Sequence, residues 1–168
     1  MKFTPLILML SALLVCLPAE ARKKEFDIDA RRNVVMKRSG GPGVKIVEVT
    51  ARGGSVDKAI DRALTDAVAA LTFDGAPGSS EVAACPPVLA EGKAVYADNK
   101  DFFDTFFEDG GCLRFVRRVS DDYPTGTDNV KVGRERQVRL TLIVNWQGLA
   151  ELMHTRGLKT TIGNLQDL

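Results

Sequence analysis

The residues of this chain best suited to chemistry are three cysteines and a single histidine. Cys16, Cys85 and Cys112 lie far apart in the sequence, and no histidine–cysteine cluster has the spacing of a zinc site. His154 falls near the end of a predicted helix, where the helix dipole favours a cation and no catalytic partner can be assigned to it. We therefore expect no catalytic residue, no metal site and no cofactor, and the chain is not predicted to be an enzyme.

Two other segments have compositions found in binding sites. Carboxylates gather between Asp98 and Asp109, but they lack the order of an EF-hand, and a solvated helix face explains them better. The segment 52–55 (RGGS) precedes a predicted helix, where backbone amides can hold an anion. It lacks the lysine of a P-loop and is too short for a dinucleotide fingerprint, so we interpret it as a structural turn.

The first 21 residues have the features of a secretory signal peptide. Lys2 supplies a positive charge, and the apolar run 6–17 of about 12 residues is shorter than the ~20 needed to span a bilayer. Ala19 and Ala21 then form a small-x-small site, which predicts cleavage after Ala21. Cys16 leaves open an alternative, lipidation as in bacterial lipoproteins, although the preceding residue is valine. We expect an exported protein of the periplasm or outer-membrane periphery, with membrane contact only through the signal peptide or that lipid.

The rest of the chain is long enough for one domain. Its 23 Lys and Arg residues nearly balance 22 Asp and Glu residues, so the charge does not indicate nucleic acid as a partner. We divide it into a basic N-terminal arm or short strand (22–43), a single α+β domain (44–157) and a C-terminal tail (158–168). The arm is either a solvated terminus or a contact for anionic lipid or polymer.

A strand, a glycine turn and a long helix from Val44 to Leu71 form the centre of the predicted domain. The strand is rich in β-branched residues, and Ser55 is a suitable N-cap. Apolar residues spaced for the buried side of the helix are Ala59, Ile60, Ala63, Leu64, Ala67, Val68 and Leu71. The polar residues expected on its solvent side are Asp57, Lys58, Asp61, Arg62, Thr65 and Asp66.

Later segments predict further helices and strands. A short helix through Glu108 carries four phenylalanines on one face, either a second core helix or an aromatic platform for sugar or peptide. Strands are expected over 113–120 and 133–144 as an antiparallel pair, with Gln137, Arg139, Thr141 and Ile143 sharing one side of the second. Asn145 begins a final helix that ends at Gly157. The predicted fold is α+β, a small and mostly antiparallel sheet of three to four strands under an alanine-rich helix, with one or two further helices packed on it.

Cys85 and Cys112 are expected to form a disulfide. Cleavage after Ala21 removes Cys16, and an exported protein reaches a compartment in which disulfides persist. The bond would close a loop of about 28 residues and contribute roughly 3–4 kcal/mol by chain-entropy reasoning. Two buried free thiols are the alternative, because the sequence does not show whether the two Cα atoms approach.

Four quoted segments, VEVTARGGS, KAIDRALTDAVAAL, LRFVRRV and QVRLTLIVNW, follow one another between Val44 and Gly157. In this order they resemble the N-terminal domain of the flagellar assembly protein T group and its secreted bacterial relatives. The resemblance implies a small α+β domain in an exported, non-enzymatic protein tied to assembly of the cell envelope or cell surface. It implies no catalytic residues.

Two classes of function remain. The first is an accessory or assembly factor of the bacterial cell envelope that acts by contacts with envelope proteins, whose identity the sequence does not give. The alternative is a small extracellular binding module for a glycan or peptide. An exposed apolar patch or an unpaired sheet edge favours the first, and a concave pocket lined by exposed aromatic residues favours the second.

Overall fold

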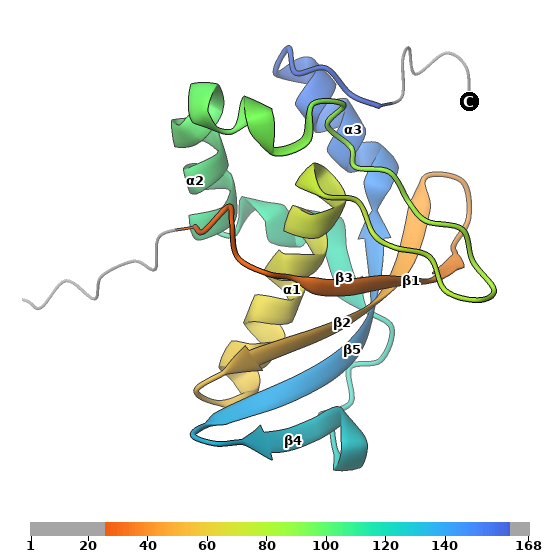
Figure 1. Ribbon diagram of the computed structural model, residues 1–168, viewed down its shortest axis with the longest axis vertical. Coiled ribbons are helices and arrows are strands. Elements are labelled where there is room, and N and C mark those ends of the chain that lie inside the picture. The colour runs from red at the N-terminus through yellow and green to blue at the C-terminus, as the bar shows by residue number, and fades with distance from the viewer. Residues whose placement is uncertain (1–25, 162–168) are drawn as a thin grey trace, which may run out of the picture.

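The chain folds into one antiparallel sheet with helices packed on one side of it (Figure 1). The computed structural model describes residues 26–161. Within this range the strands are β1 (Asn33–Ser39), β2 (Val44–Gly53), β3 (Val116–Arg118), β4 (Asn129–Val132) and β5 (Glu135–Asn145). The helices are α1 (Val56–Phe73), α2 (Lys100–Glu108) and α3 (Trp146–Thr155). Short 3₁₀ turns lie at η1 (Gly92–Val95), η2 (Ala97–Asn99), η3 (Gly111–Phe115) and η4 (Gly126–Asp128).

The two long strands β2 and β5 form the centre of the sheet. They pair antiparallel from Val44 opposite Asn145 to Gly53 opposite Arg136, and β1 pairs with the other side of β2. The outer side of β5 is divided, because β3 pairs only with its last part and β4 only with its first part. The predicted α+β class with an antiparallel sheet is confirmed, and the sheet has five strands within the described residues.

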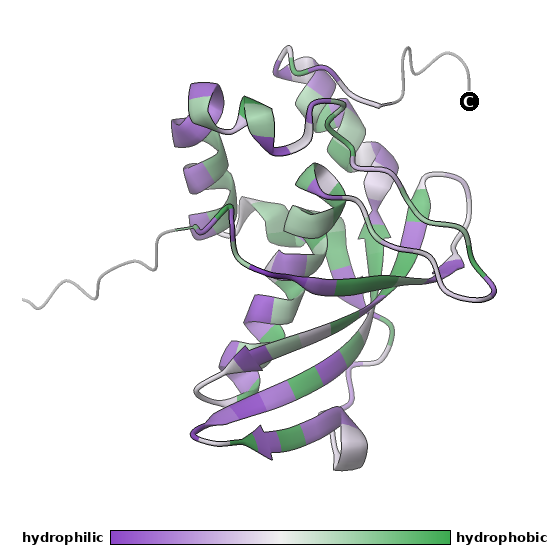
Figure 2. Cartoon of the chain, in the orientation of Figure 1, coloured by the Kyte–Doolittle hydropathy of each residue, from purple (hydrophilic) through white to green (hydrophobic). Residues whose placement is uncertain are grey.

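Alternation along the strands gives the sheet two different faces, visible as alternating colours on β2 and β5 in Figure 2. One face is apolar and buried beneath α1, and its central residues are Val47, Val49, Ala51, Val138, Leu140, Leu142 and Val144. We call the opposite side the open face. Its strand residues are Asn33, Val35, Lys37, Arg38, Val44, Ile46, Glu48, Thr50, Arg52, Arg117, Val130, Val132, Glu135, Gln137, Arg139, Thr141, Ile143 and Asn145.

The long helix α1 begins at the expected cap and lies very close to the sheet. The Ser55 hydroxyl accepts a hydrogen bond from the backbone N–H of Lys58 at 3.2 Å. A Cβ atom on Gly53 would lie 2.5 Å from the backbone nitrogen of Ala59, so only glycine allows this approach. Six of the seven residues predicted for the core side are buried, namely Ala59, Ile60, Ala63, Ala67, Val68 and Leu71. Leu64 is half-buried and packs against the edge of the core.

The prediction that Asp66 faces solvent is wrong. Its carboxylate is buried and forms ion pairs with Arg32, which precedes β1, and with Arg62 on the preceding turn of α1. The helical pattern could not show this, because the side chain of Arg32 comes from a distant part of the sequence. Asp66 is therefore a buried charged residue, although the helical pattern places it among the polar positions of α1.

The phenylalanines of α2 pack in or against the core, which agrees with the first of the two alternatives given above, a second core helix. Phe103, Phe106 and Phe107 are buried, and Phe73 at the end of α1 meets Phe103 edge-on with ring centroids 4.9 Å apart. Phe26 stacks on Phe107 at 4.1 Å. Such aromatic contacts hold the start of the described chain against the two helices.

The strand predicted over 113–120 is much shorter in the structure. Residues 111–115 form the turn η3, which follows Gly110 in a left-handed conformation, and only β3 pairs with β5. β4 lies between the two strands expected over 113–120 and 133–144, where no strand was predicted. The sheet also extends to β1, before the predicted domain boundary at Val44, and Leu158 after Gly157 is buried.

The expected disulfide is absent from the described residues, in which Cys85 and Cys112 are both free and buried. Cys85 forms a two-way backbone bridge with Ala76, just beyond the end of α1. Cys112 contacts Thr65, in the middle of the same helix. Thr65 lies eight residues before Phe73, so the positions of the two cysteines differ by about 12 Å along the axis of α1. The crossing from α1 to α2 is thus fixed by backbone hydrogen bonds.

The predicted signal peptide, with Cys16, Ala19 and Ala21, lies outside the described residues. Within residues 26–161, none of the helices has the length and apolar character needed to cross a membrane.

Candidate functional site

Side chains with catalytic or metal-binding potential are dispersed in the described part of the chain. Nowhere between residues 26 and 161 do three or more His, Cys, Asp or Glu residues form a group that could hold a metal ion. His154 is exposed on α3. Burial raises the pKa of the Cys85 thiol, and burial raises the pKa of Cys112 to about 11 despite its contact with Thr65. Both thiols are therefore protonated at neutral pH, the unreactive form of cysteine.

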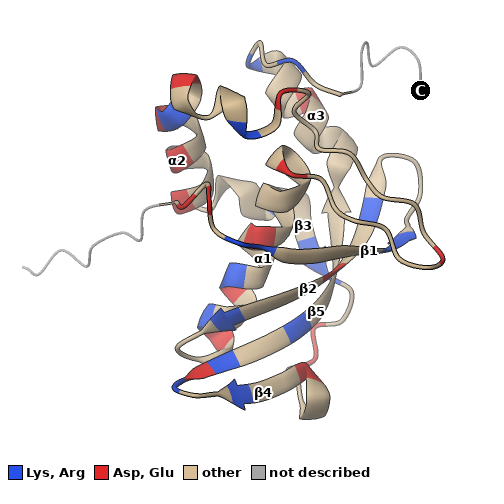
Figure 3. Cartoon of the chain, in the orientation of Figure 1, with Lys and Arg blue, Asp and Glu red and all other residues tan. Residues whose placement is uncertain are grey.

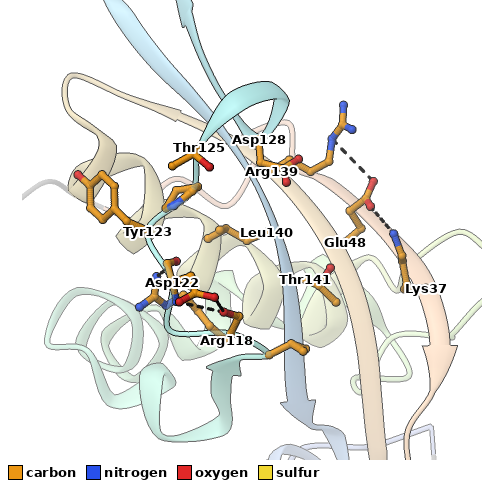
Figure 4. Close-up of a pocket in the computed structure, with 13 residues that line it drawn as sticks. Lys37, Glu48, Arg118, Asp122, Tyr123, Thr125, Asp128, Arg139, Leu140 and Thr141 are labelled. Atoms are coloured by element: carbon orange, nitrogen blue, oxygen red, sulfur yellow. Dashed lines mark hydrogen bonds and ion pairs between the residues drawn. The ribbon is translucent and has the colours of Figure 1, made fainter.

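A hollow of about 510 Å³ lies on the open face, between β2 and the loop that joins β3 to β4 (Figure 4). Glu48 lies at its border between two cations: Lys37 Nζ is 2.7 Å from one carboxylate oxygen, and Arg139 Nε is 4.0 Å from the other. These side chains come from β1, β2 and β5 and join three strands across the sheet. Because Lys37 and Arg139 are about half exposed, this cluster gives little stability and leaves one excess positive charge at the surface.

A second row of side chains crosses the open face near the other end of the strands. The register places Arg38 of β1 opposite Ile46, Ile46 opposite Ile143, and Ile143 opposite Arg117 of β3. Ile46 is only 7% exposed although it lies outside the contiguous core beneath α1. The row therefore consists of a buried and a half-buried isoleucine between two exposed arginines.

The open face carries more positive than negative charge. Its strand residues include five cations, Lys37, Arg38, Arg52, Arg117 and Arg139, and two carboxylates, Glu48 and Glu135. Arg38, Arg52 and Arg117 have no ion-pair partner within residues 26–161; Arg52 instead donates to the side-chain oxygen of Gln137 at 2.9 Å. Figure 3 shows cationic segments (blue) recurring along β1, β2 and β5.

The loop between β3 and β4 forms the outer wall of the hollow. Arg118 donates to the backbone oxygens of Asp121 and Asp122, and this turns the loop back on itself. Tyr123 is 55% exposed, and its hydroxyl donates to Asp57 on α1 at 3.2 Å. The exposed ring of Tyr123 thus lies at the rim of the hollow and points from there toward α1, away from the other lining side chains (Figure 4).

A second hollow, of about 540 Å³, lies where the start of the described chain meets α1 and α2. Arg32 borders it and donates to the backbone oxygens of Asp27, Ile28 and Ala30. Desolvation lowers the pKa of Arg32 even though Asp66 and Asp74 act in the opposite direction. Because most of its donors already bind the chain, we assign Arg32 a structural role.

Alternation in β5 had placed Gln137, Arg139, Thr141 and Ile143 on one side, and the structure places them together on the open face. Strands near β1 and β3 were also expected, but the residues that they contribute to the open face were not identified from the sequence. Arg38 and Arg117 lie in segments with mixed patterns, and only the strand register brings them beside Ile46 and Ile143. The segment 52–55 forms the turn into α1 at the border of the second hollow.

Comparisons of the chain with protein families, with curated proteins and with solved structures found no match.

Proposed function

We propose that this protein is an exported, non-enzymatic accessory or assembly factor of the bacterial cell envelope that binds envelope proteins through the open face. The observation that carries the proposal is the asymmetry of the sheet. α1 buries one face, whereas the other presents an ordered array of charged side chains around the apolar pair Ile46 and Ile143. Exposed polar positions placed on a rigid sheet are suited to recognition.

The open face is large enough for a specific protein contact. The sheet is as long as its central strands of ten and eleven residues and is four strands wide. At the usual spacings along and between strands, such a face covers on the order of 600 Å². A standard protein–protein interface buries roughly 800 Å² on each partner. A partner that also contacts the loop between β3 and β4 reaches this size.

Export follows from the signal peptide proposed for residues 1–21. The mature protein is then expected to begin at Arg22, and N-terminal sequencing of the exported form tests this. A blocked, lipid-bearing Cys16 would instead place the protein on a membrane surface.

Site-specific photo-crosslinking in cell envelopes tests the function. A photo-reactive amino acid at Thr141, on the open face, is expected to capture a defined envelope protein. The same group at Thr105, exposed on α2, serves as the control and is expected to capture none. No adduct at Thr141, or the same adducts at both positions, would contradict the proposal.

Binding of a small glycan or peptide is the second candidate, favoured by the exposed ring of Tyr123 at the rim of the hollow. Aromatic rings at a rim stack on sugar faces or on peptide side chains. On this view Tyr123→Ala abolishes binding in a glycan or peptide array. If Tyr123→Ala instead leaves the Thr141 adduct unchanged and no array ligand binds, the protein-contact function is the better account.

A further inference from the structure

We infer that the partner of the open face is an acidic amphipathic helix, with an apolar side chain over Ile46 and Ile143 and carboxylates against Arg38 and Arg117. This inference rests on the proposed function and specifies the chemistry of the partner. The row of four residues carries it, because the row combines two unpaired guanidinium groups with an apolar centre.

The spacing of the row fits a helix that crosses the strands. Arg38 and Arg117 are separated by three strand intervals, or about 14 Å between their Cα atoms. In a helix, two glutamates placed four residues before and four residues after a leucine lie about 12 Å apart, with all three on the same side. One helix can therefore bring both carboxylates and the central leucine to the row at once.

The charges of the row are available to a partner. Neither Arg38 nor Arg117 forms an ion pair within the described residues, and both side chains are exposed. A planar guanidinium binds a carboxylate through two parallel hydrogen bonds, which fixes orientation as well as charge. Glu48, the nearest acidic residue of the open face, is already held by Lys37 and Arg139 and does not neutralise the row.

Two other occupants fit less well. A second copy of the chain would bring two net positive surfaces together, and like charges across an interface oppose association. The headgroups of an anionic membrane offer phosphate groups to the two arginines, but no apolar group at the same level for the half-buried Ile143 between them. Covering Ile143 while both arginines are paired requires an apolar side chain between the anions, as in a leucine flanked by glutamates.

The probe is a fluorescein-labelled helical peptide with a central leucine and glutamates four residues to either side. Fluorescence anisotropy at about 50 mM salt measures its binding to the mature protein, and binding is expected to weaken as salt rises. The double variant Arg38→Glu/Arg117→Glu is expected to bind about tenfold more weakly or worse. The matched control Arg31→Glu/Lys159→Glu has the same net charge, changes exposed residues outside the open face, and is expected to stay within about twofold.

Several results would overturn the inference. Equal losses in the two double variants would show that only net charge matters. Full affinity of a probe with glutamine in place of leucine would show that the apolar pair does not contribute. Vesicles of phosphatidylglycerol that bind in an Arg38- and Arg117-dependent way, while the peptide does not bind, would identify a membrane as the occupant. Thermal unfolding of each variant confirms that it is folded before binding is compared.

The same variants separate this inference from the proposed function. If the Thr141 crosslink to an envelope protein persists in Arg38→Glu/Arg117→Glu, the acidic-helix inference is wrong while the protein-contact function stands. If no envelope protein is captured at Thr141, the proposed function fails whatever the peptide does. Amide chemical shifts that move along β1, β3 and β5 when the peptide is added would support the inference directly.

Discussion

The Nε atom of Arg32 lies 3.7 Å from Oδ1 of Asp66, and the two side chains are only 3% and 11% exposed. This ion pair joins the residue before β1 to the middle of α1. The same guanidinium donates to backbone oxygens of residues 27, 28 and 30, so one side chain holds the start of the described chain on the helix.

Replacing Arg32 with methionine is expected to destabilise the protein by about 3 kcal/mol, because the buried carboxylate of Asp66 would lose its ion pair with a buried cation. Urea unfolding measures the loss. Arg62→Met is the control and should cost less than ~1 kcal/mol, since the Arg62 side chain is 39% exposed. Arg32→Met combined with Asp66→Leu should recover most of the loss. Equal effects of the two single variants would show that the buried pair has no special role.

Cys112 is expected to make the stability fall in alkaline solution. Burial raises the pKa of Cys112 in the folded state to about 11 from 9.0, so the folded state holds the thiol proton more tightly than the unfolded state. The contribution of this thiol to the free energy of unfolding is therefore complete below pH 9 and is lost as the pH rises to about 11. The free-energy gap between wild type and Cys112→Ala should narrow by about 2 kcal/mol between pH 8 and pH 11. Urea unfolding of both proteins across this range gives the gap. A constant gap would mean that the thiolate is tolerated in the folded state.

Gly75→Ala is expected to be much more costly than Gly157→Ala. Both glycines have positive φ, at 74° and 75°, which costs an L-residue about 1 kcal/mol. At Gly75 a Cβ atom would also lie 2.5 Å from the backbone oxygen of Cys85, whereas nothing lies within 4 Å at Gly157. Thermal unfolding should therefore separate the two variants by at least about 1 kcal/mol. Equal melting temperatures would show that the backbone near Cys85 shifts to accommodate the added Cβ atom without loss of stability.

Ala63→Leu is expected to destabilise by roughly 1–3 kcal/mol, because Ala63 is fully buried where α1 approaches the sheet. Asp61→Leu, on the exposed side of the same helix, provides the control and should change stability by less than about 0.5 kcal/mol. Denaturant unfolding compares the two. An unchanged stability for Ala63→Leu would mean that the interface between α1 and the sheet has room for the larger side chain.

Elements with local signals were predictable from the sequence. α1 and α3 begin at Ser55 and Asn145, whose side chains accept hydrogen bonds from the following turn, and β5 shows clean alternation. The short length of β3, within a strand expected over 113–120, and the presence of β4 were not predictable, because three- and four-residue strands exist only by pairing with β5. The burial of Asp66 likewise depends on Arg32, a contact between distant segments.

The open face was only partly predictable for the same reason. Period-two alternation assigned Arg139, Thr141 and Ile143 to one side of β5, but it carries no information about neighbouring strands. Arg38 follows an irregularity in the register of β1, and Arg117 belongs to a three-residue strand. Their position beside Ile46 and Ile143 is a property of the assembled sheet.

The division of the outer side of β5 between β3 and β4 has a consequence for aggregation. Long, unbroken strand edges are templates on which other chains add by backbone pairing. Here one edge consists of two short pieces, and on the opposite edge the N–H of Met36 already donates to the backbone oxygen of Pro77. Lysine and arginine at β1 and β4 add charge where chains would meet. The sheet can therefore present a broad face to a partner while its edges resist fibril-like growth, so the domain should stay dispersed at high concentration.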